Sequence, residues 1–171
     1  MKLIHTLALL TLASVPAFAN VNYYVSSSVL ASCSQKTTAS GYEPVQSYGL
    51  SGTDPGAGAK IVLGDFSILK TFDDCSGALA TQFLEGQAIP TLTLIAQSTA
   101  SASSAPVTFL TITLTNAVID NYAYSASSGS GVPEESVSFR YQSVCINSTP
   151  TDGSKASKVC YDSSSNRVTT N

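Results

Sequence analysis

The sequence predicts a mainly β domain, an antiparallel sandwich or barrel that carries one short α-helix. Three observations indicate this class. Apolar and polar residues alternate with a period of two in several short segments, which is typical of strands with one buried face. Turn-forming residues separate these segments, and a single stretch has helical periodicity. Many short strands with turn signals and one helix are typical of antiparallel β folds.

The expected strands cover most of the chain. A first strand spans residues 21–29, and residues 34–59 are so rich in turn formers that we expect a long exposed loop around 52–58. Residues 60–71 form a β-rich stretch in which Gly64 marks a bulge or bend. The later strands are expected at 88–97, 107–115, 116–124, 137–142 and 158–162, with a Ser/Gly loop at 125–131 and a polar tail at the end.

The one expected helix spans residues 74–85, DCSGALATQFLE. Asp73 or Asp74 can cap its start, and Gly86 can end it. Its apolar stripe, which we expect to pack on a sheet, consists of Cys75, Leu79, Phe83 and Leu84.

The first nineteen residues predict a cleavable signal peptide. Lys2 precedes an apolar run over residues 6–15, and Ala17-Phe18-Ala19 is a small-x-small cleavage pattern, so that we expect cleavage after Ala19. Pro16 interrupts the run before it reaches the roughly 20 residues that span a bilayer. Residues 20–171 are then expected to form a single secreted or periplasmic domain with no membrane contact.

Charge excludes some partners. Cleavage would remove one of eight basic residues and the only histidine, His5, while all eleven acidic residues remain, which gives a net charge of −4. An acidic chain without a basic cluster is a poor nucleic-acid binder, because such binding depends on neutralising phosphates.

The four cysteines, Cys33, Cys75, Cys145 and Cys160, indicate disulfides, because an even number in an exported chain favours them. Three pairings are possible. We favour Cys145 with Cys160, because the residues between them look like the loop of a hairpin, and this leaves Cys33 with Cys75. Zinc sites need close cysteine pairs or histidines, so we expect no metal.

Catalytic chemistry finds little support in the sequence. Without a histidine, triads of the Ser-His-Asp or Cys-His kind are excluded from the mature chain. Adjacent carboxylates such as Glu134 and Glu135 point to opposite faces of a strand, so they cannot flank one bond as a glycosidase pair must. A pairing of either with Asp65 or Asp120 stays open. We interpret the two glutamates as the entrance to a strand, and we expect no catalytic residue and no cofactor.

The tyrosines and one short motif have simpler interpretations. The eight tyrosines, at positions 23, 24, 42, 48, 122, 124, 141 and 161, could stack on sugars, but in a β domain they more often pack a sheet. Asn147-Ser148-Thr149 matches a glycosylation sequon, which arises easily by chance.

The order of segments between residues 60 and 162 resembles the haemolysin-coregulated protein (Hcp) family of type VI secretion tube proteins. The run GDFSILKTFDDCSGALATQFLEGQAIPTLTLIAQ has the strand, helix and Leu-Thr-Leu strand of that family. A Leu-Thr-Ile-Thr-Leu-Thr-Asn strand follows, and then a Ser/Gly loop that leads through VPEE into the strand containing Val137, Ser138 and Phe139. The DGSK of residues 152–155 lies where the family has a comparable turn.

The resemblance implies a two-sheet β-barrel with one helix, which assembles into hexameric rings that stack into a tube and bind exported effectors. It also implies that the loop at residues 43–59 contacts the next ring. The signal peptide and the cysteines depart from the family, whose members ordinarily leave through their own machine. We therefore keep a stand-alone secreted binding or adhesion module, with the same fold, as an alternative.

Overall fold

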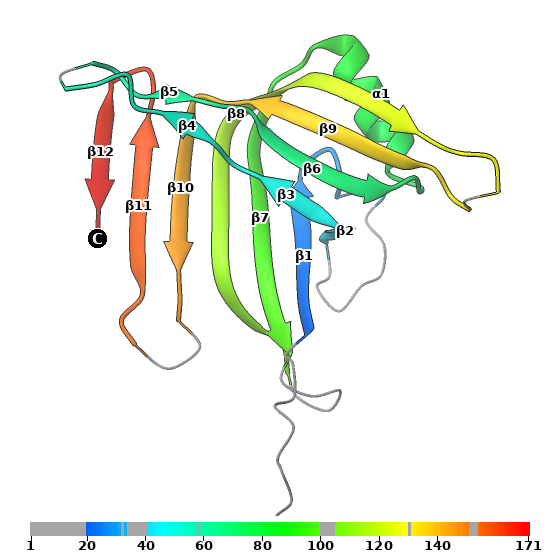
Figure 1. Cartoon of the computed structure of the whole chain (residues 1–171), viewed down its shortest axis with the longest axis horizontal. Helices are drawn as coiled ribbons and strands as arrows, with labels where there is room; N and C mark the ends of the chain where they lie inside the picture. Colours follow the sequence, from blue (N-terminus) through cyan, green and yellow to red (C-terminus); the bar gives the residue numbers. More distant parts are fainter. Residues whose placement is uncertain are drawn as a thin grey trace, which may run out of the picture.

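The computed structural model describes residues 20–31, 33, 41–57, 59–99, 105–129, 131–150 and 154–171. The expected signal peptide, at residues 1–19, and part of the expected turn at 152–155 lie outside the described residues. The described chain is mainly β with one helix, and its strands form antiparallel sheets (Figure 1). The predicted fold class is therefore confirmed. No described helix is long and apolar enough to cross a membrane.

The elements follow one another in this order along the chain: β1 (Asn20–Ser27), β2 (Glu43–Val45), β3 (Ser47–Gly49), β4 (Gly52–Thr53), β5 (Val62–Leu63), β6 (Phe66–Thr71), α1 (Ser76–Glu85), β7 (Ile89–Thr99), β8 (Val107–Ser125), β9 (Glu134–Arg140), β10 (Ser143–Ser148), β11 (Ser157–Asp162) and β12 (Arg167–Thr170). The strand order of the first sheet is β12-β11-β10-β8-β7-β1-β2, and β3, β6, β9 and β8 pair in that order to form the second. The short strands β4 and β5 pair only with each other.

Strand β8 belongs to both sheets, and it corrects the expectation of two strands at 107–115 and 116–124. Its residues up to Ala117 pair with β7, whereas those from Val118 pair with β9. Asn116, at the change, has a φ of 50°, a left-handed conformation that asparagine tolerates better than most residues. The strand therefore turns from one sheet into the other without ending.

A second crossing lies at the opposite edge. Residues 43–49 pair first with β1, through β2, and then with β6, through β3. Between them the backbone N–H of Gln46 donates to the carbonyl of Leu69 at 2.8 Å. The two sheets are thus connected at both edges and enclose one core.

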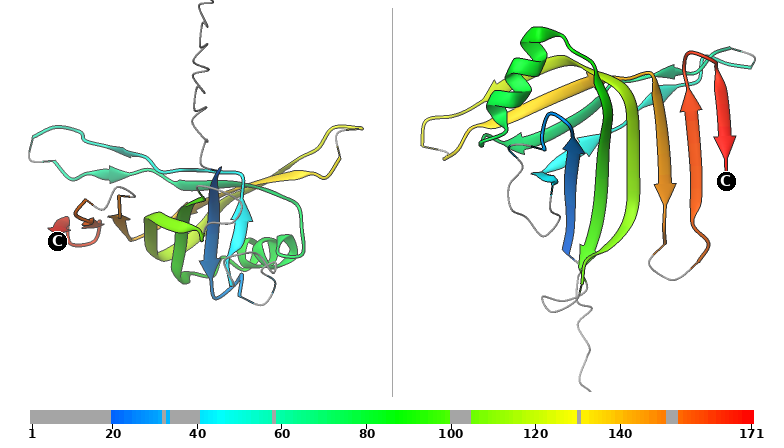
Figure 2. Two further views of the ribbon diagram at one scale, coloured as in Figure 1. Left: turned by 90° about the horizontal axis from the view of Figure 1, so that it is seen from below. Right: turned by 180° about the vertical axis from the view of Figure 1, so that it is seen from behind.

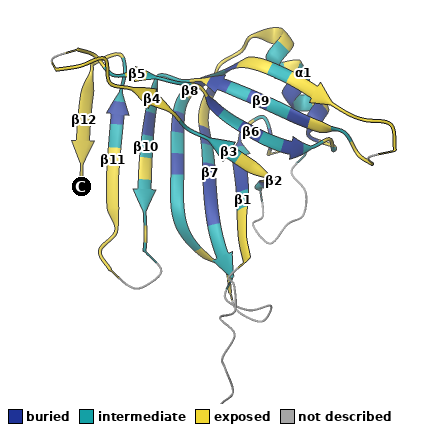
Figure 3. Ribbon diagram, in the orientation of Figure 1, coloured by how far each residue is buried: buried dark blue, intermediate teal, exposed yellow. Residues whose placement is uncertain are grey.

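The core lies between the two sheets, as the burial colours of Figure 3 show. The expected alternation is confirmed: Leu92 and Leu94 on β7 are almost fully buried, as are Val137 and Phe139 on β9. The other large members of this core are Val25, Leu30, Val45, Phe66, Ile68, Leu79, Ile89, Ile112, Leu114, Ile119, Val144 and Tyr161.

Helix α1 begins and ends near the predicted residues. Cys75 is its N-cap and has no side-chain cap, although the Asp73 carboxylate accepts a hydrogen bond from the Cys75 N–H at 2.9 Å. Gly86 ends the helix with a φ of 62°, which favours glycine. Leu79 is buried, but Leu84 is 81% exposed. The prediction that Leu84 belongs to the packed stripe is wrong, because this residue lies one position, about 100°, beyond Phe83 around the helix.

The bend expected at Gly64 is confirmed: β5 ends before it and β6 begins after it, and the Gly64 N–H donates to the Ser51 carbonyl at 2.9 Å. Two other expectations need correction. Strand β5 then pairs with β4 to form a projecting hairpin, called the arm below, where a long loop was expected (Figure 2). The supposed polar tail contains β12, which pairs with β11. Strands β10, β11 and β12 extend the first sheet beyond the barrel, and we call them the flange.

The structure joins Cys33 to Cys75 and Cys145 to Cys160 as disulfides. The first links the segment after β1 to the start of α1. The second joins directly opposed residues of β10 and β11 in the flange. The first bridge therefore lies against the core, where Cys75 is fully buried, and the second lies on the flange.

We predict that loss of either bridge destabilises the fold, and that loss of Cys33–Cys75 has the larger effect. The bridged residues are separated by 42 positions in that pair and by 15 in the other. Because each bridge restricts the unfolded chain, Cys33–Cys75 should contribute about 4 kcal/mol to the stability of the fold and Cys145–Cys160 about 3 kcal/mol. Paired Cys→Ala variants, compared by urea unfolding, measure the difference. Peptide mapping without reduction checks the connectivity, and a peptide that joins Cys33 to Cys145 would refute it.

Candidate functional site

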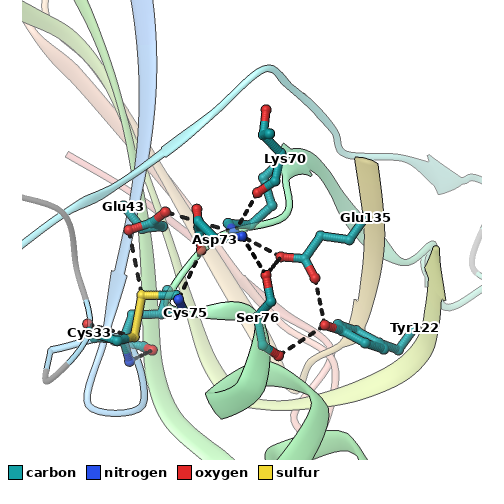
Figure 4. The surroundings of a disulfide bond; sticks show 11 residues. Cys33, Glu43, Lys70, Asp73, Cys75, Ser76, Tyr122 and Glu135 are labelled. Carbon is teal, nitrogen blue, oxygen red and sulfur yellow. Dashed lines mark hydrogen bonds and ion pairs between the residues drawn. A yellow bond between two sulfur atoms is a disulfide. The ribbon is translucent and has the colours of Figure 1, made fainter. Parts of the chain in front are cut away.

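Among the described residues, the most unusual feature is a group of mainly buried, charged side chains near the start of α1 (Figure 4). We call it the Lys70 cluster, and it consists of Glu43, Lys70, Asp73, Ser76, Tyr122 and Glu135. The Lys70 ammonium lies 2.7 Å from a Glu135 carboxylate oxygen and 2.7 Å from an Asp73 oxygen. Glu43 lies further away, at 3.8 Å. The side chains of Lys70, Glu43 and Glu135 are fully buried.

Strand periodicity puts the central pair inside the protein. Lys70 follows Phe66 and Ile68 on the inner face of β6, where every second residue is buried. On β9 the inner face begins with Glu135 and continues with Val137 and Phe139. Antiparallel pairing then sets Lys70 directly opposite Glu135. Because a buried charge is tolerated only with a partner, each residue requires the other.

This placement changes the interpretation of the adjacent glutamates. The expectation that they point to opposite faces is confirmed, since Glu134 is exposed and Glu135 is fully buried. The two glutamates are the first residues of β9, as expected of a strand entrance, but the Glu135 side chain points into the protein. Its oxygens accept hydrogen bonds from the Ser76 hydroxyl, at 2.8 Å, and from the Tyr122 hydroxyl, at 2.5 Å.

The Tyr122 hydroxyl connects the cluster to the surface. It is 3.0 Å from the Ser76 carbonyl and accepts a hydrogen bond from the exposed Tyr124 at 3.0 Å. Burial, and after it the hydrogen bond to the Glu135 carboxylate, raises the pKa of Tyr122 above its ordinary value. The phenol therefore stays protonated and serves as a hydrogen-bond donor.

Asp73 forms the other side of the cluster. Burial raises the pKa of its carboxyl group, but hydrogen bonds with Glu43, Lys70 and the Cys75 N–H outweigh burial and hold the pKa below its ordinary value. A carboxylate oxygen of Glu43, one of Asp73 and the Cys75 sulfur lie close enough to one another to hold a metal ion. However, that sulfur belongs to a disulfide and cannot be a thiolate ligand. The Lys70 ammonium already supplies the cation, so the donor set does not fit a metal.

The cluster is suited to a structural role. It joins β2, β6, α1, β8 and β9, which supply Glu43, Lys70, Ser76, Tyr122 and Glu135 respectively. Its central charges have no exposed surface on which a substrate could bind. The arrangement can therefore stabilise the packing of α1 on the barrel, and it offers no accessible nucleophile.

The other acidic candidates lie elsewhere. Asp120 forms a surface ion pair with Arg140. Asp65 and Arg140 line a cavity of about 370 Å³ at the base of the arm, together with Tyr141. Burial, and next the charge of Asp65, raises the pKa of Tyr141 to about 12. No contact joins these acids to the glutamates, and the hypothesis of a carboxylate pair gains no support.

The tyrosines mainly pack on other aromatic rings. Tyr23 meets Tyr48 edge to face at 5.2 Å, and Tyr122 stacks on Phe83 at 6.0 Å. The Tyr161 hydroxyl donates to the Ile61 carbonyl and so attaches the flange to the base of the arm. Asn147 and Ser148 of the sequon lie in β10, which is paired on both sides, and a paired strand is a poor setting for a glycan.

Comparison with known proteins gives one family. The family described as "Type VI secretion system effector, Hcp" matches residues 34–147. No curated protein matches the chain.

Solved structures show the same fold. Hcp1 from Salmonella typhimurium superposes with a TM-score of 0.72 at 17% identity, covering 87% of this chain and 99% of that chain. A type VI secretion effector from Yersinia pestis gives 0.65 at 17% identity, covering 82% and 98%. Hcp3 from Pseudomonas aeruginosa gives 0.63 at 16% identity, covering 85% and 98%. At these identities the likeness establishes the fold alone.

We predict that the two adjacent glutamates differ sharply in their effect on stability. Glu135→Gln removes a charge that the buried Lys70 needs, and breaking a buried ion pair costs about 3–5 kcal/mol. Glu134→Gln changes an exposed residue and should stay within about 0.5 kcal/mol of wild type. Urea unfolding at pH 7 measures both. Equal effects of the two substitutions would contradict the structural role of the cluster.

We also predict an acid-dependent loss of stability through Asp73. Because the folded-state pKa lies below the ordinary value of 3.8, this carboxylate contributes stability above that value, and the contribution is lost as the pH falls through the folded-state pKa. Asp73→Asn should lower stability at pH 7 and flatten the decline below pH 4. Asp54→Asn, in the exposed arm, is the control. Parallel curves for wild type and Asp73→Asn would exclude this role.

Proposed function

The chain belongs to the Hcp family of type VI secretion system effectors, and on that basis we propose that it is a structural, non-enzymatic subunit that self-assembles. The family match to residues 34–147 carries the proposal. The Lys70 cluster supports the non-enzymatic part, because its central charges are enclosed and held by ion pairs.

We propose that the assembly is a ring, hexameric as the family resemblance implies, and that rings stack into a tube or carry secreted effectors. The arm supports stacking, because its first strand, β4, and the residues that follow it belong to the segment 43–59 that the resemblance assigns to contact with the next ring. It projects away from the barrel and its residues 52–57 are exposed (Figure 2). An exposed two-stranded hairpin gains little from its own chain, so a neighbouring molecule is a suitable partner.

For export, we propose that residues 1–19 form a signal peptide cleaved after Ala19 and that residues 20–171 form one domain that folds in an oxidising compartment. The two disulfides support this location, since such bonds form and persist outside the cytosol. The subunit would then leave the cytosol by the general secretory route rather than through a type VI machine of its own.

One observation favours the alternative of a stand-alone secreted binding module. Phe72, Tyr124, Tyr122 and Phe83 form a continuous series of ring contacts that runs from the end of β6 to α1. Phe72 and Tyr124 are exposed. Such a series could receive a ligand as readily as a second subunit.

The mass of the purified mature protein in solution tests the proposal. We expect a concentration-dependent oligomer by analytical ultracentrifugation or light scattering, and ring particles in electron micrographs. Mass spectrometry of the same sample identifies its first residue. A strict monomer at high concentration, with a ligand-dependent rise in thermal stability, would favour the binding module instead.

A further inference from the structure

We propose that the flange carries a thiol-exchange site, at which a small thiol with an amino-acid head attacks Cys160 and opens the Cys145–Cys160 disulfide. The thiol is of the cysteine kind, with one thiol group, one ammonium group and one carboxylate. It binds in a cavity of the flange that has a volume of about 280 Å³. This site does not depend on the proposed assembly.

The Cys145–Cys160 bridge lies on the outer face of the flange. Cys145 is directly opposite Thr113 of β8, which follows Ile112, a residue buried in the core. Because neighbouring residues of a strand point to opposite faces, Thr113 and the bridge point away from the core. Both cysteines are only half-buried, and exposed disulfides are the ones that exchange most readily with small thiols.

The cavity determines which of the two sulfur atoms is attacked. Cys160 lines it, together with Asp162, Arg167 and Thr169, whereas Cys145 does not. A thiol that binds in the cavity therefore meets the Cys160 sulfur, and Cys145 is the leaving group. The volume of about 280 Å³ lies just below the range of about 300–1,000 Å³ that is typical of pockets for drug-sized ligands, so the cavity suits a smaller molecule.

Two charged side chains of the cavity match an amino-acid head. Asp162 and Arg167 are directly opposite each other on β11 and β12, and they share the face of Cys160, because strand residues two positions apart point the same way. Among the described residues no ion pair joins the Arg167 guanidinium to a carboxylate.

The Asp162 carboxylate is held in its charged form. It accepts hydrogen bonds from the hydroxyl and the N–H of Ser164, at 2.6 and 2.8 Å, and these bonds hold the pKa of Asp162 below its ordinary value. A ligand ammonium can therefore pair with Asp162. A ligand carboxylate can pair with Arg167, whose planar guanidinium suits that group.

The exchange needs no oxidant or reductant besides the thiol itself. The ligand thiolate forms a bond with the Cys160 sulfur while the bond between Cys160 and Cys145 breaks. The electron pair of the broken bond stays on the Cys145 sulfur, which takes up a proton from water. The products are a mixed disulfide on Cys160 and a free thiol at Cys145. The hairpin of β10 and β11 keeps its strand pairing but is no longer covalently closed.

The Cys33–Cys75 bridge provides an internal comparison, because the same exchange is disfavoured there. Cys75 is fully buried and Cys33 half-buried, so an entering thiolate has to attack Cys33. The Cys75 sulfur then leaves as a thiolate 3.5 Å from a Glu43 carboxylate oxygen (Figure 4). The adjoining Lys70 cluster has three carboxylates against one ammonium, and such negative, buried surroundings disfavour a thiolate.

Mass spectrometry of the mature protein, with both bridges formed, tests the site. The protein is incubated with excess cysteine at about pH 8, where the free thiol is partly ionised, and samples taken at early times are quenched with acid. Peptide mapping without reduction then locates the added group. We expect a cysteinyl group on Cys160 and a free thiol at Cys145, formed at least about tenfold faster than Cys33–Cys75 opens.

Arg167→Gln separates recognition of the thiol from simple exposure of the bridge. This variant should slow exchange with cysteine about two- to fivefold, the range expected for one exposed ion pair, and leave exchange with 2-mercaptoethanol, which has no carboxylate, unchanged. Arg140→Gln changes the net charge equally outside the cavity and is the control. Circular dichroism verifies that both variants fold.

Three results would each overturn the site. The first is a Cys33–Cys75 bridge that opens as fast as Cys145–Cys160 or faster. The second is the lack of a cysteinyl group on Cys160, whether the group is found on Cys145 or on neither residue. The third is an Arg167→Gln variant whose rates with cysteine and with 2-mercaptoethanol change by the same factor, or do not change.

Discussion

The ion pair between Lys70 and Glu135 is the interaction on which the packing of α1 against β6, β8 and β9 depends. It lies where β6 and β9 are directly paired, and both side chains are fully buried. A buried ammonium surrounded by apolar residues would be strongly destabilising without its carboxylates. The start of α1 must therefore bring Asp73 and Ser76 into place. The Cys33–Cys75 disulfide fixes the helix at the residue between them, so covalent and electrostatic constraints act on the same turn of backbone.

Two crossings determine the shape that surrounds this cluster. At Asn116 strand β8 leaves one sheet and enters the other, and residues 43–49 do the same at the opposite edge. These crossings close the two sheets around the core, and the first sheet continues beyond them as the flange. The core-side face of the flange has no opposing sheet, and Ile146 and Val159 on that face are exposed. The incomplete cover is thus a consequence of the topology.

Sequence patterns predict the faces of strands better than their extent or partners. The alternation in 88–97 and 107–115 predicts the buried leucines, because neighbouring residues of a strand point to opposite faces whatever the strand pairs with. The same rule could have placed Lys70 in phase with Phe66 and Glu135 in phase with Val137, since both lie two residues from a core position. Their pairing could not be predicted, because 65 residues separate them. The continuity of β8 was missed because asparagine at a bend resembles the end of a strand.

The position of the second disulfide follows from the same incomplete cover. A hairpin packed between two sheets is stabilised by burial on its inner face, but the flange exposes Ile146 and Val159 at its centre. Cys145 directly precedes Ile146 in β10, Cys160 directly follows Val159 in β11, and the two cysteines are directly opposite each other. A covalent bridge there holds the hairpin in register where burial of its inner face contributes little.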